Sequence, residues 1–358
     1  MIYIHVPFCH RKCTYCAFYS VRGSESEMRR YVESLLCEMD LRRGEQAHPI
    51  RTVYFGGGTP SILPIEQLGR IVDGLHLCFD LSAIEEMTVE ANPEDLAPEY
   101  LASLKALGFN RISIGIQSLD DNMLRMIGRR HTAQQALDAV ENAHAAGFDN
   151  ISVDFIYGLP TGFQFSFFNF QFITHLSAYA LTIEPGTALA RQVEQGRVVL
   201  PDDDEVVRQY HALHRQFAEA GFRQYEVSNY ARPGYESKHN SRYWDRTPYL
   251  GLGPGAHSFD GTRRRWNIGD VQRYISGTCP FEEETLTPAD AYNELLMTAL
   301  RTTAGLPMAA VPDAQRESLR HSMQPYIDCG WIIIRDNHYI PTEEGLLHTD
   351  GLAASLFV

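Results

Sequence analysis

Three cysteines close to the start of the sequence carry its clearest chemical signal. Cys9, Cys13 and Cys16 stand in the pattern C-x-x-x-C-x-x-C, which brings three soft thiolates onto one loop. Thiolates of this kind bind iron–sulfur clusters or zinc. On a four-iron cluster, three cysteines would leave one iron without a protein ligand and free to bind a substrate. The alternative is a zinc site completed by His5 or His10, although structural zinc usually has four protein ligands.

A glycine-rich turn is the second candidate site. It reads Gly56-Gly57-Gly58-Thr59-Pro60 and follows the second predicted strand. Glycine allows a ligand to approach the backbone closely and allows a positive φ. The turn lacks the G-x-G-x-x-G spacing of dinucleotide-binding proteins. Taken alone it could be a tight loop, but beside the cysteines it indicates a shared ligand site.

Polar residues stand at or near the ends of the later predicted strands, where the surrounding pattern is apolar. They are Glu90, Gln117, Arg129 and Asp154. Asp154 is the most informative, because a carboxylate within a buried strand is costly unless it is paired or hydrogen-bonded. Each residue alone could be structural. Together, with one in each strand-and-helix unit, they favour one cleft that contains an amine, a carboxylate and a ribose.

Short apolar runs alternate with helical periodicity, which predicts parallel βαβ units. We expect an α/β fold, a partial (β/α)6 barrel whose working loops follow the strands, as the cysteine loop does. A small C-terminal α+β domain of winged-helix type should follow, so that residues 1–285 and 286–358 form two domains. The predicted strands are 2–6, 52–55, 87–90, 111–116, 151–157, 178–183 and the hairpin 331–334 with 338–341. The predicted helices are 27–41, 65–78, 98–107, 121–127, 133–146, 292–300, 314–326 and 342–357.

The overall composition excludes several classes of function. The net charge of −14 argues against a nucleic-acid surface, which needs clustered Lys and Arg. The first residues lack the pattern of a signal peptide, and no apolar run approaches 18 residues. The seven cysteines are odd in number and mostly scattered, unlike a disulfide framework. We therefore expect a cytoplasmic protein.

The motifs resemble those of the oxygen-independent coproporphyrinogen III oxidases and their relatives, a family of radical S-adenosylmethionine (SAM) proteins. They are Y-I-H-V-P-F-C, G-G-G-T-P-S, E-A-N-P, G-I-Q-S, Y-G-L-P and L-T-I-E-P-G-T. The resemblance implies a radical-SAM barrel with a 4Fe-4S cluster whose open iron binds SAM. It implies that Cys9, Cys13 and Cys16 bind the cluster and that Tyr3 and Tyr15 contact SAM. It also implies that Gly57, Gly58 and Thr59 hold the methionine end of SAM. The residues that would complete the SAM pocket are Glu90, Gln117, Arg129 and Asp154.

Two details favour the heme-chaperone branch of this family. The decarboxylating oxidases carry a fourth cysteine where this chain has Phe18, and the chaperone branch carries an H-N-x-x-Y-W motif, which is complete here from His239 to Trp244. The resemblance implies a carrier that binds heme and passes it to apo-hemoproteins. We expect His239 to bind the heme iron or lie against the heme, with Tyr243 and Trp244 beside the porphyrin; His257 is the second candidate. The alternative is an oxidase that decarboxylates coproporphyrinogen.

One segment does not fit the expected pattern. A crossover helix is expected between Pro160 and Ser177, but residues 163–172 are rich in Phe, and 163, 165 and 167 alternate like a strand. The sequence leaves open a buried shortcut, a surface for a partner or lipid, and a defect in the sequence. A homodimer and peripheral membrane association are open as well.

Overall fold

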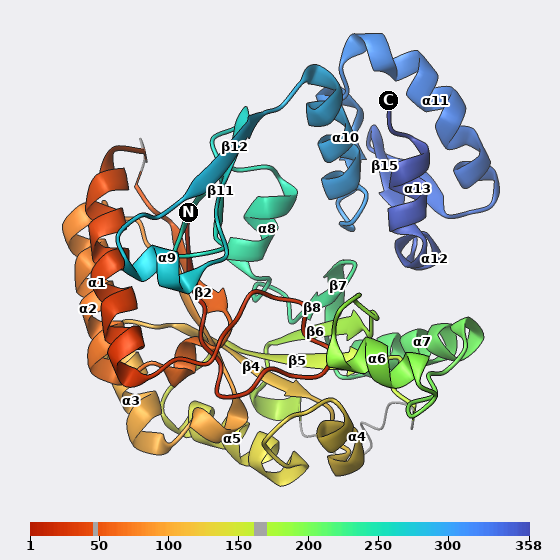
Figure 1. The fold of residues 1–358 in the computed structure, drawn as a ribbon. Helices are drawn as coiled ribbons and strands as arrows, with labels where there is room; N and C mark the ends of the chain where they lie inside the picture. Colours follow the sequence, from red (N-terminus) through yellow and green to blue (C-terminus); the bar gives the residue numbers. More distant parts are fainter. Residues whose placement is uncertain (46–48, 161–169) are drawn as a thin grey trace.

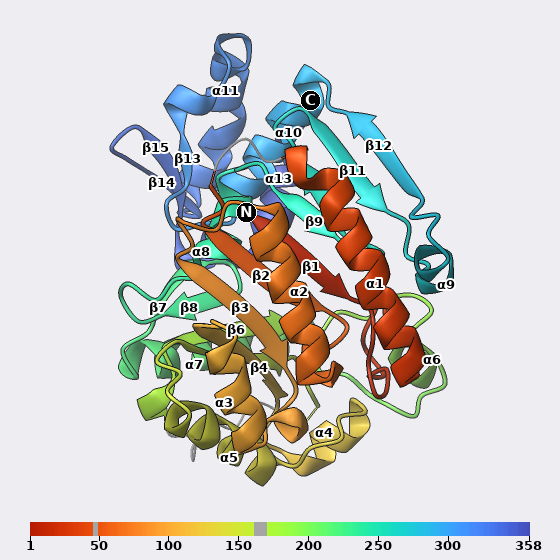
Figure 2. The ribbon, with the colours of Figure 1, turned by 90° about the vertical axis from the view of Figure 1, so that its left-hand side faces the viewer.

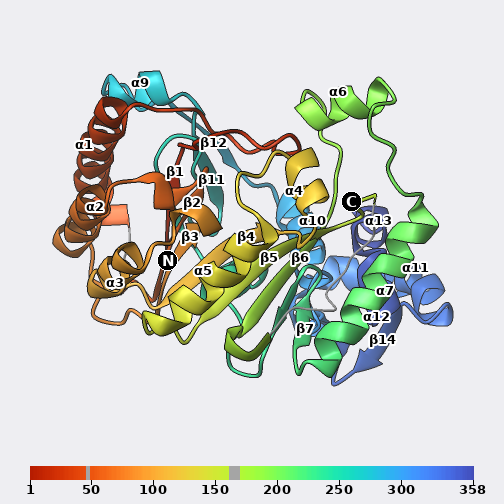
Figure 3. The ribbon, with the colours of Figure 1, turned by 90° about the horizontal axis from the view of Figure 1, so that it is seen from below.

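A partial β/α barrel forms the larger part of the molecule. The computed structural model describes residues 1–45, 49–160 and 170–358. A nine-stranded sheet has the order β7-β8-β6-β5-β4-β3-β2-β1-β9, and its six central strands are parallel neighbours in chain order. Figure 3 shows them as an arc. These strands are β1 (Ile2–Val6), β2 (Thr52–Gly57), β3 (Glu86–Ala91), β4 (Arg111–Gln117), β5 (Ile151–Tyr157) and β6 (His175–Ala180). The predicted fold class is confirmed.

Helices cover the outer face of the arc and leave its inner face, the lumen, polar. Figure 2 shows α1, α2 and α3 packed along β1, β2 and β3. In β4, for example, Ile112, Ile114 and Ile116 point outward into the core, while Arg111 and Ser113 alternate with them toward the lumen. The outer helices are α1 (Glu25–Arg42), α2 (Ile65–Cys78), α3 (Pro98–Ala106), α4 (Asp121–Met126), α5 (Ala133–Ala145), α6 (Ala188–Glu194) and α7 (Asp203–Glu219).

Both edges of the barrel are extended by elements that the sequence pattern did not reveal. β8 pairs antiparallel with β6, and β9 pairs parallel with β1. A second sheet, β10-β11-β12, continues from β9 through a bridge between Tyr249 and Phe259. These elements are β7 (Arg223–Glu226), β8 (Asn229–Ala231), α8 (Lys238–Trp244), β9 (Leu250–Leu252), β10 (His257–Phe259), β11 (Arg263–Asn267), α9 (Val271–Ile275) and β12 (Phe281–Thr285).

The C-terminal part has a hydrophobic cluster of its own, which runs from Tyr292 to Leu356. Its three-stranded antiparallel sheet has the order β13-β15-β14. The predicted hairpin is present, but the third strand is additional. The prediction of a single last helix over residues 342–357 is wrong, because the helix is interrupted at His348 and forms two shorter helices. The elements are α10 (Pro288–Ala299), β13 (Leu306–Pro307), α11 (Asp313–Asp328), β14 (Ile332–Arg335), β15 (His338–Pro341), α12 (Glu343–Leu347) and α13 (Thr349–Ser355).

Two further expectations concern the middle of the chain. The sixth strand begins at His175, three residues before its predicted start, because its lumen-facing residues His175 and Ser177 are polar and hide the strand from an apolar search. Most of the Phe-rich segment lies outside the described residues, which resume with a short 3-10 helix, Phe170–Phe172. None of the described helices is long and apolar enough to cross a membrane.

Candidate functional site

The cysteine loop is fixed at its base and at its tip. It leaves β1 and returns to it through two backbone bonds, from Cys9 N to Val21 O at 3.0 Å and from Val21 N to Pro7 O at 2.8 Å. At the tip, Thr14 N donates to Ile127 O at 3.0 Å. All three cysteines are half-buried free thiols at the carboxyl ends of the strands. The loop therefore presents three soft ligands at the end of the barrel where parallel barrels place their chemistry.

The glycine turn packs directly against this loop. A Cβ atom on Gly58 would lie 2.6 Å from the carbonyl oxygen of Phe8, beside Cys9. Gly57 has φ +110°, and a Cβ there would lie 2.8 Å from the ring of His5. Only glycine fits at these two positions. The cysteine loop and the glycine turn thus form one structure, as the sequence predicted from their neighbouring strands.

A chain of polar contacts joins two of the cysteines through the glycine turn. Thr59 Oγ1 lies 3.4 Å from Cys9 Sγ and accepts a hydrogen bond from Asn92 Nδ2 at 3.3 Å. Arg129 Nη2 donates to Asn92 Oδ1 at 2.7 Å, and its Nη1 donates to Cys13 Sγ at 3.6 Å. Donors directed at sulfur stabilise thiolates and orient metal ligands. The sequence motif E-A-N-P contained Asn92, but its linking role was not foreseen.

Gln117 ends β4 in a conformation that is unusual for a residue with a side chain. Its φ is +67°, and the pairing of β4 with β5 shifts between Gly115 and Gln117. The carbonyl oxygen of Gly115 accepts a 2.6 Å hydrogen bond from Arg129 Nη2. Strained backbone of this kind is found most often at functional sites. The bulge therefore lies next to the guanidinium that also contacts the cysteine loop.

Two predicted carboxylates lie in the lumen below the cysteine loop. Glu90 Oε1 accepts a hydrogen bond from the Tyr54 hydroxyl at 2.8 Å, and burial raises the pKa of Glu90 to about 7. Asp154 accepts from Ser113 Oγ at 3.2 Å, and burial also raises its pKa. Both groups are hydrogen-bonded, as expected for carboxylates in a low-dielectric site. They can bind cationic or hydroxyl groups of a ligand that enters from the cysteine end.

The two predicted tyrosines lie at different levels of the lumen. Tyr15 belongs to the cysteine loop and packs against Ile127 and its apolar neighbours; burial, followed by the charge of Cys13, raises its pKa. Tyr3 lies on β1, with its hydroxyl 3.2 Å from Nδ1 of His5 and its ring stacked on Tyr54 at 6.2 Å. Tyr15 is thus beside the cysteines, whereas Tyr3 is deeper in the barrel.

The H-N-x-x-Y-W motif lies at the opposite end of the strands from the cysteines. Figure 1 shows α8, which carries it, on the side of the C-terminal domain, away from the red loop that follows β1. Glu86, the first residue of β3, accepts the backbone N–H groups of α8 at Lys238 and His239. The ring of Trp244 lies 5.8 Å from the guanidinium of Arg301. The motif therefore closes the barrel's amino end.

His239 is enclosed within this plug. Its relative exposure is 0%; Nδ1 lies 3.0 Å from Thr52 Oγ1, and Nε2 lies 3.1 Å from the Tyr243 hydroxyl. Burial lowers the pKa of His239 to about 3, so the ring is neutral. In this conformation both ring nitrogens are engaged. Its predicted contact with heme stays a prediction, and iron binding through Nε2 would require the bond to Tyr243 to open.

The donor set fits an iron–sulfur cluster better than the zinc alternative. The two histidines proposed to complete a zinc site are engaged elsewhere: His10 Nε2 pairs with Asp95 at 3.4 Å, and His5 Nε2 lies 3.1 Å from the carbonyl oxygen of Tyr19. The three thiols are free, and side-chain donors from Thr59 and Arg129 reach two of them. A cluster held by three cysteines matches this set.

Comparisons with known proteins agree with these features. The model of the radical SAM superfamily matches residues 3–162, and that of the HemN C-terminal domain matches residues 286–348. The chain is 37% identical to a heme chaperone HemW of Mycobacterium tuberculosis, over 99% of this chain and 94% of that protein. It is 35% identical to heme chaperone HemW of Bacillus subtilis, over 85% of this chain and 84% of that protein.

The similarity extends to a mitochondrial protein and to a solved structure. A radical S-adenosyl methionine domain-containing protein 1 of Mus musculus is 40% identical over 72% of this chain and 60% of its own length. The coproporphyrinogen III oxidase HemN of Escherichia coli has the same fold, with a TM-score of 0.84 over 100% of this chain and 89% of that one. Its sequence identity is 21%, so this likeness concerns the fold alone.

Proposed function

The chain belongs to the HemW family within the radical SAM superfamily, and from this premise we propose that it binds heme and delivers it to apo-hemoproteins. The observation that carries the proposal is the identity of 37% over 99% of the chain to a protein named as a heme chaperone. The same premise supports a 4Fe-4S cluster and SAM as bound cofactors, with the residues that the sequence predicted for them.

Cys9, Cys13 and Cys16 would hold the cluster, whose open iron supplies a binding position for SAM. Arg129 orients the thiolate of Cys13 and, through Asn92, the Thr59 hydroxyl next to Cys9. The glycine turn, which packs against the cysteine loop, would hold the methionine end of SAM. Glu90 and Asp154 offer hydrogen-bond acceptors deeper in the lumen.

Phe18 separates the proposal from its alternative, oxidative decarboxylation of coproporphyrinogen. The decarboxylating oxidases have a similar loop, but they carry a fourth cysteine at the position of Phe18. Phe18 is 72% exposed beside the cysteine loop, and its backbone oxygen accepts a hydrogen bond from Lys12 Nζ at 3.1 Å. A phenyl ring offers no thiolate, so the fourth cysteine of those oxidases has no counterpart here.

The test compares the two activities on one preparation. Cluster-reconstituted protein is titrated with hemin and followed by its Soret band, then mixed with an apo-hemoprotein to measure heme transfer. The same protein is supplied anaerobically with coproporphyrinogen, SAM and a reductant, and protoporphyrinogen is assayed. We expect saturable heme binding and transfer without decarboxylation. Turnover of coproporphyrinogen without specific heme binding would establish the alternative.

A further inference from the structure

The bulge in β4 places strain on a residue of the proposed SAM pocket. Gln117 has φ +67°, a left-handed conformation that is unfavourable for a residue with a side chain. It stands where the pairing of β4 with β5 shifts its register. Such a conformation persists only where the surrounding structure fixes it. The groups that fix Gln117 therefore belong to the construction of the pocket.

The conformation of Gln117 determines where its amide lies. A Cβ atom on Gly115 would lie 2.8 Å from Gln117 Nε2 and 3.3 Å from Arg129 Nη2. The Gln117 side chain thus turns back over Gly115 and ends beside the guanidinium of Arg129. An ordinary strand conformation at position 117 would direct the side chain to the opposite face from its neighbours. The left-handed backbone therefore brings two polar groups of the predicted pocket together.

Two side chains of one loop hold consecutive carbonyl groups of this bulge. Arg129 Nη2 donates to the carbonyl oxygen of Gly115 at 2.6 Å. His131 Nε2 lies 3.0 Å from the carbonyl oxygen of Ile116. A carbonyl oxygen only accepts, so Nε2 of His131 carries a proton and donates it to this bond. His131 therefore fixes the peptide group that precedes Gln117 and restrains the φ of that residue.

His131 is itself held in one orientation. It is buried, and its Nδ1 forms an ion pair with Glu94 Oε2 at 3.4 Å. Burial acts to raise the pKa of Glu94, but the contact with His131 and the charge of Arg129 outweigh it and lower that pKa, so Glu94 is a carboxylate. Glu94 stands two residues after Asn92, which bonds Arg129 at 2.7 Å. One short turn after β3 thus orients both side chains that hold the bulge.

We propose that His131 is a positioning residue for SAM binding, which holds Gln117 in its left-handed conformation and keeps the Gln117 amide beside Arg129 in the pocket. The inference rests on the proposed SAM site and adds a residue that the sequence-based prediction of that site did not include. His131 acts through the carbonyl group of Ile116 rather than by contact with SAM. Its effect therefore has a signature that a merely buried histidine lacks.

Isothermal titration calorimetry of the cluster-reconstituted full chain with SAM tests this inference in a double-variant cycle with Gln117→Gly. His131→Ala alone should weaken SAM binding at least about fivefold, because the strained conformation is unfavourable by such a factor once its bond is lost. Glycine adopts a positive φ without strain, so the Gln117→Gly background has no need of that bond. There, His131→Ala should change the SAM affinity less than about twofold, as expected when one residue acts through the other.

His175→Ala is the matched control, because His175 is also buried with both ring nitrogens bonded, to Ser152 and Tyr225, but begins β6 at the other end of the strands. It should bind SAM as the wild type does. Unchanged SAM affinity in His131→Ala would overturn the inference, as would an equal loss in the Gln117→Gly background or in His175→Ala. If His131→Ala does not fold, His131→Leu, which fills the space but donates no hydrogen bond, takes its place.

A wild-type chain that binds no SAM would refute the proposed SAM site. The same cycle measured by thermal unfolding then still shows whether His131 acts through Gln117, because the strain is a property of the chain itself. The two failures are therefore distinguishable.

Discussion

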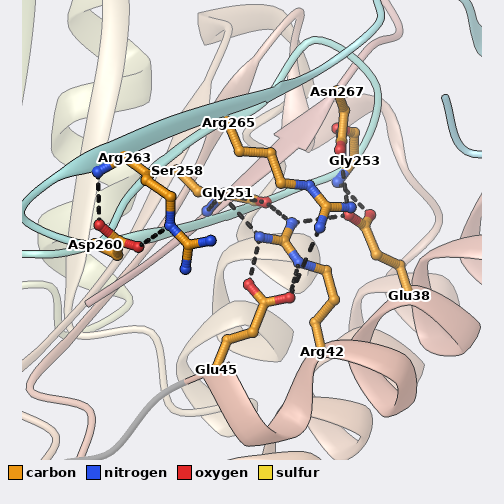
Figure 4. Close-up of polar contacts among 10 residues, drawn as sticks. All are labelled: Glu38, Arg42, Glu45, Gly251, Gly253, Ser258, Asp260, Arg263, Arg265 and Asn267. Carbon is orange, nitrogen blue, oxygen red and sulfur yellow. Dashed lines mark hydrogen bonds and ion pairs between the residues drawn. The ribbon is translucent and has the colours of Figure 1, made fainter. Parts of the chain in front are cut away.

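Glu38 is the residue whose removal we expect to cost the most stability around the turn between β9 and β10. Glu38 lies on α1 and is 4% exposed. Its carboxylate accepts hydrogen bonds from four groups, one on the same helix and three from distant parts of the chain. Figure 4 shows it beneath the turn between β9 and β10, beside the guanidinium of Arg42. The donors are Arg42 Nη1 at 3.1 Å, Gly253 N at 2.9 Å, Asn267 Nδ2 at 2.7 Å and the Tyr274 hydroxyl at 2.6 Å.

Glu38→Ala would leave a buried guanidinium and three further donors without their acceptor. Removing one partner of a buried ion pair costs about 3–5 kcal/mol. Unfolding entropy is about 2.1 cal/mol/K per residue, so for a chain of 358 residues this loss lowers Tm by roughly 4–7 °C. Arg42 would keep Glu45, Gly251 and Ser258 as acceptors, which limits the loss to this range rather than a larger one.

Differential scanning calorimetry of the wild type, Glu38→Ala and Glu33→Ala measures this effect. Glu33 lies on the same helix and is exposed, so the same substitution there tests helix propensity and net charge alone. A double variant of Glu38 and Arg42 should lose less than the two single variants together, because the residues are in contact. If Glu38→Ala melts within about 1 °C of Glu33→Ala, a difference of less than ~1 kcal/mol for this size, the reasoning is refuted.

Three further outcomes follow from the site and its surroundings. Replacing the three loop cysteines together by Ala should abolish the cluster absorbance and the roughly four irons per chain that this ligand set should bind. The control Cys37→Ala, at an exposed cysteine on α1, should retain both. Bound iron in the triple variant, or stoichiometric zinc in the wild type, would contradict the assignment. Arg129→Lys should lower SAM affinity several-fold by calorimetry, because one ammonium cannot reach Asn92, Gly115 and Cys13 as the guanidinium does; unchanged affinity would make Arg129 a structural residue. Burial raises the pKa of Glu226 to about 7 from 4.5, so its carboxyl lowers stability as pH rises between these values. Glu226→Gln should therefore raise the free energy of unfolding at pH 8 by up to about 3 kcal/mol, seen as a higher Tm, but should not raise it at pH 4; an equal effect at both pH values would exclude this origin.

The barrel could be predicted from sequence because its signals are local. Apolar strands with intervening helices fix β1 to β5 within one or two residues at each end. The cysteine loop and glycine turn could be joined for the same reason, since both follow neighbouring parallel strands. The pairing of β9 with β1 was missed, because β9 has three residues and lies about 250 positions from its partner. No local pattern carries that information.

Residue types in the site were easier to foresee than their partners. Arg129 was expected to complete the SAM pocket, but the sequence did not reveal its contacts with Asn92, Gly115 and Cys13. Arg111 is another example: a guanidinium only 1% exposed, in the lumen, looked in sequence like the first residue of an ordinary strand. Long polar side chains find partners from strands far apart in sequence, and only the fold determines which partners those are.

The motif around His239 shows the same limit where it matters most for function. β2 runs from Thr52, which bonds His239, to Gly57 in the glycine turn, a span of about 16 Å at roughly 3.3 Å per residue. A heme bound through His239 would therefore lie a full strand length from the glycine turn that we propose for SAM.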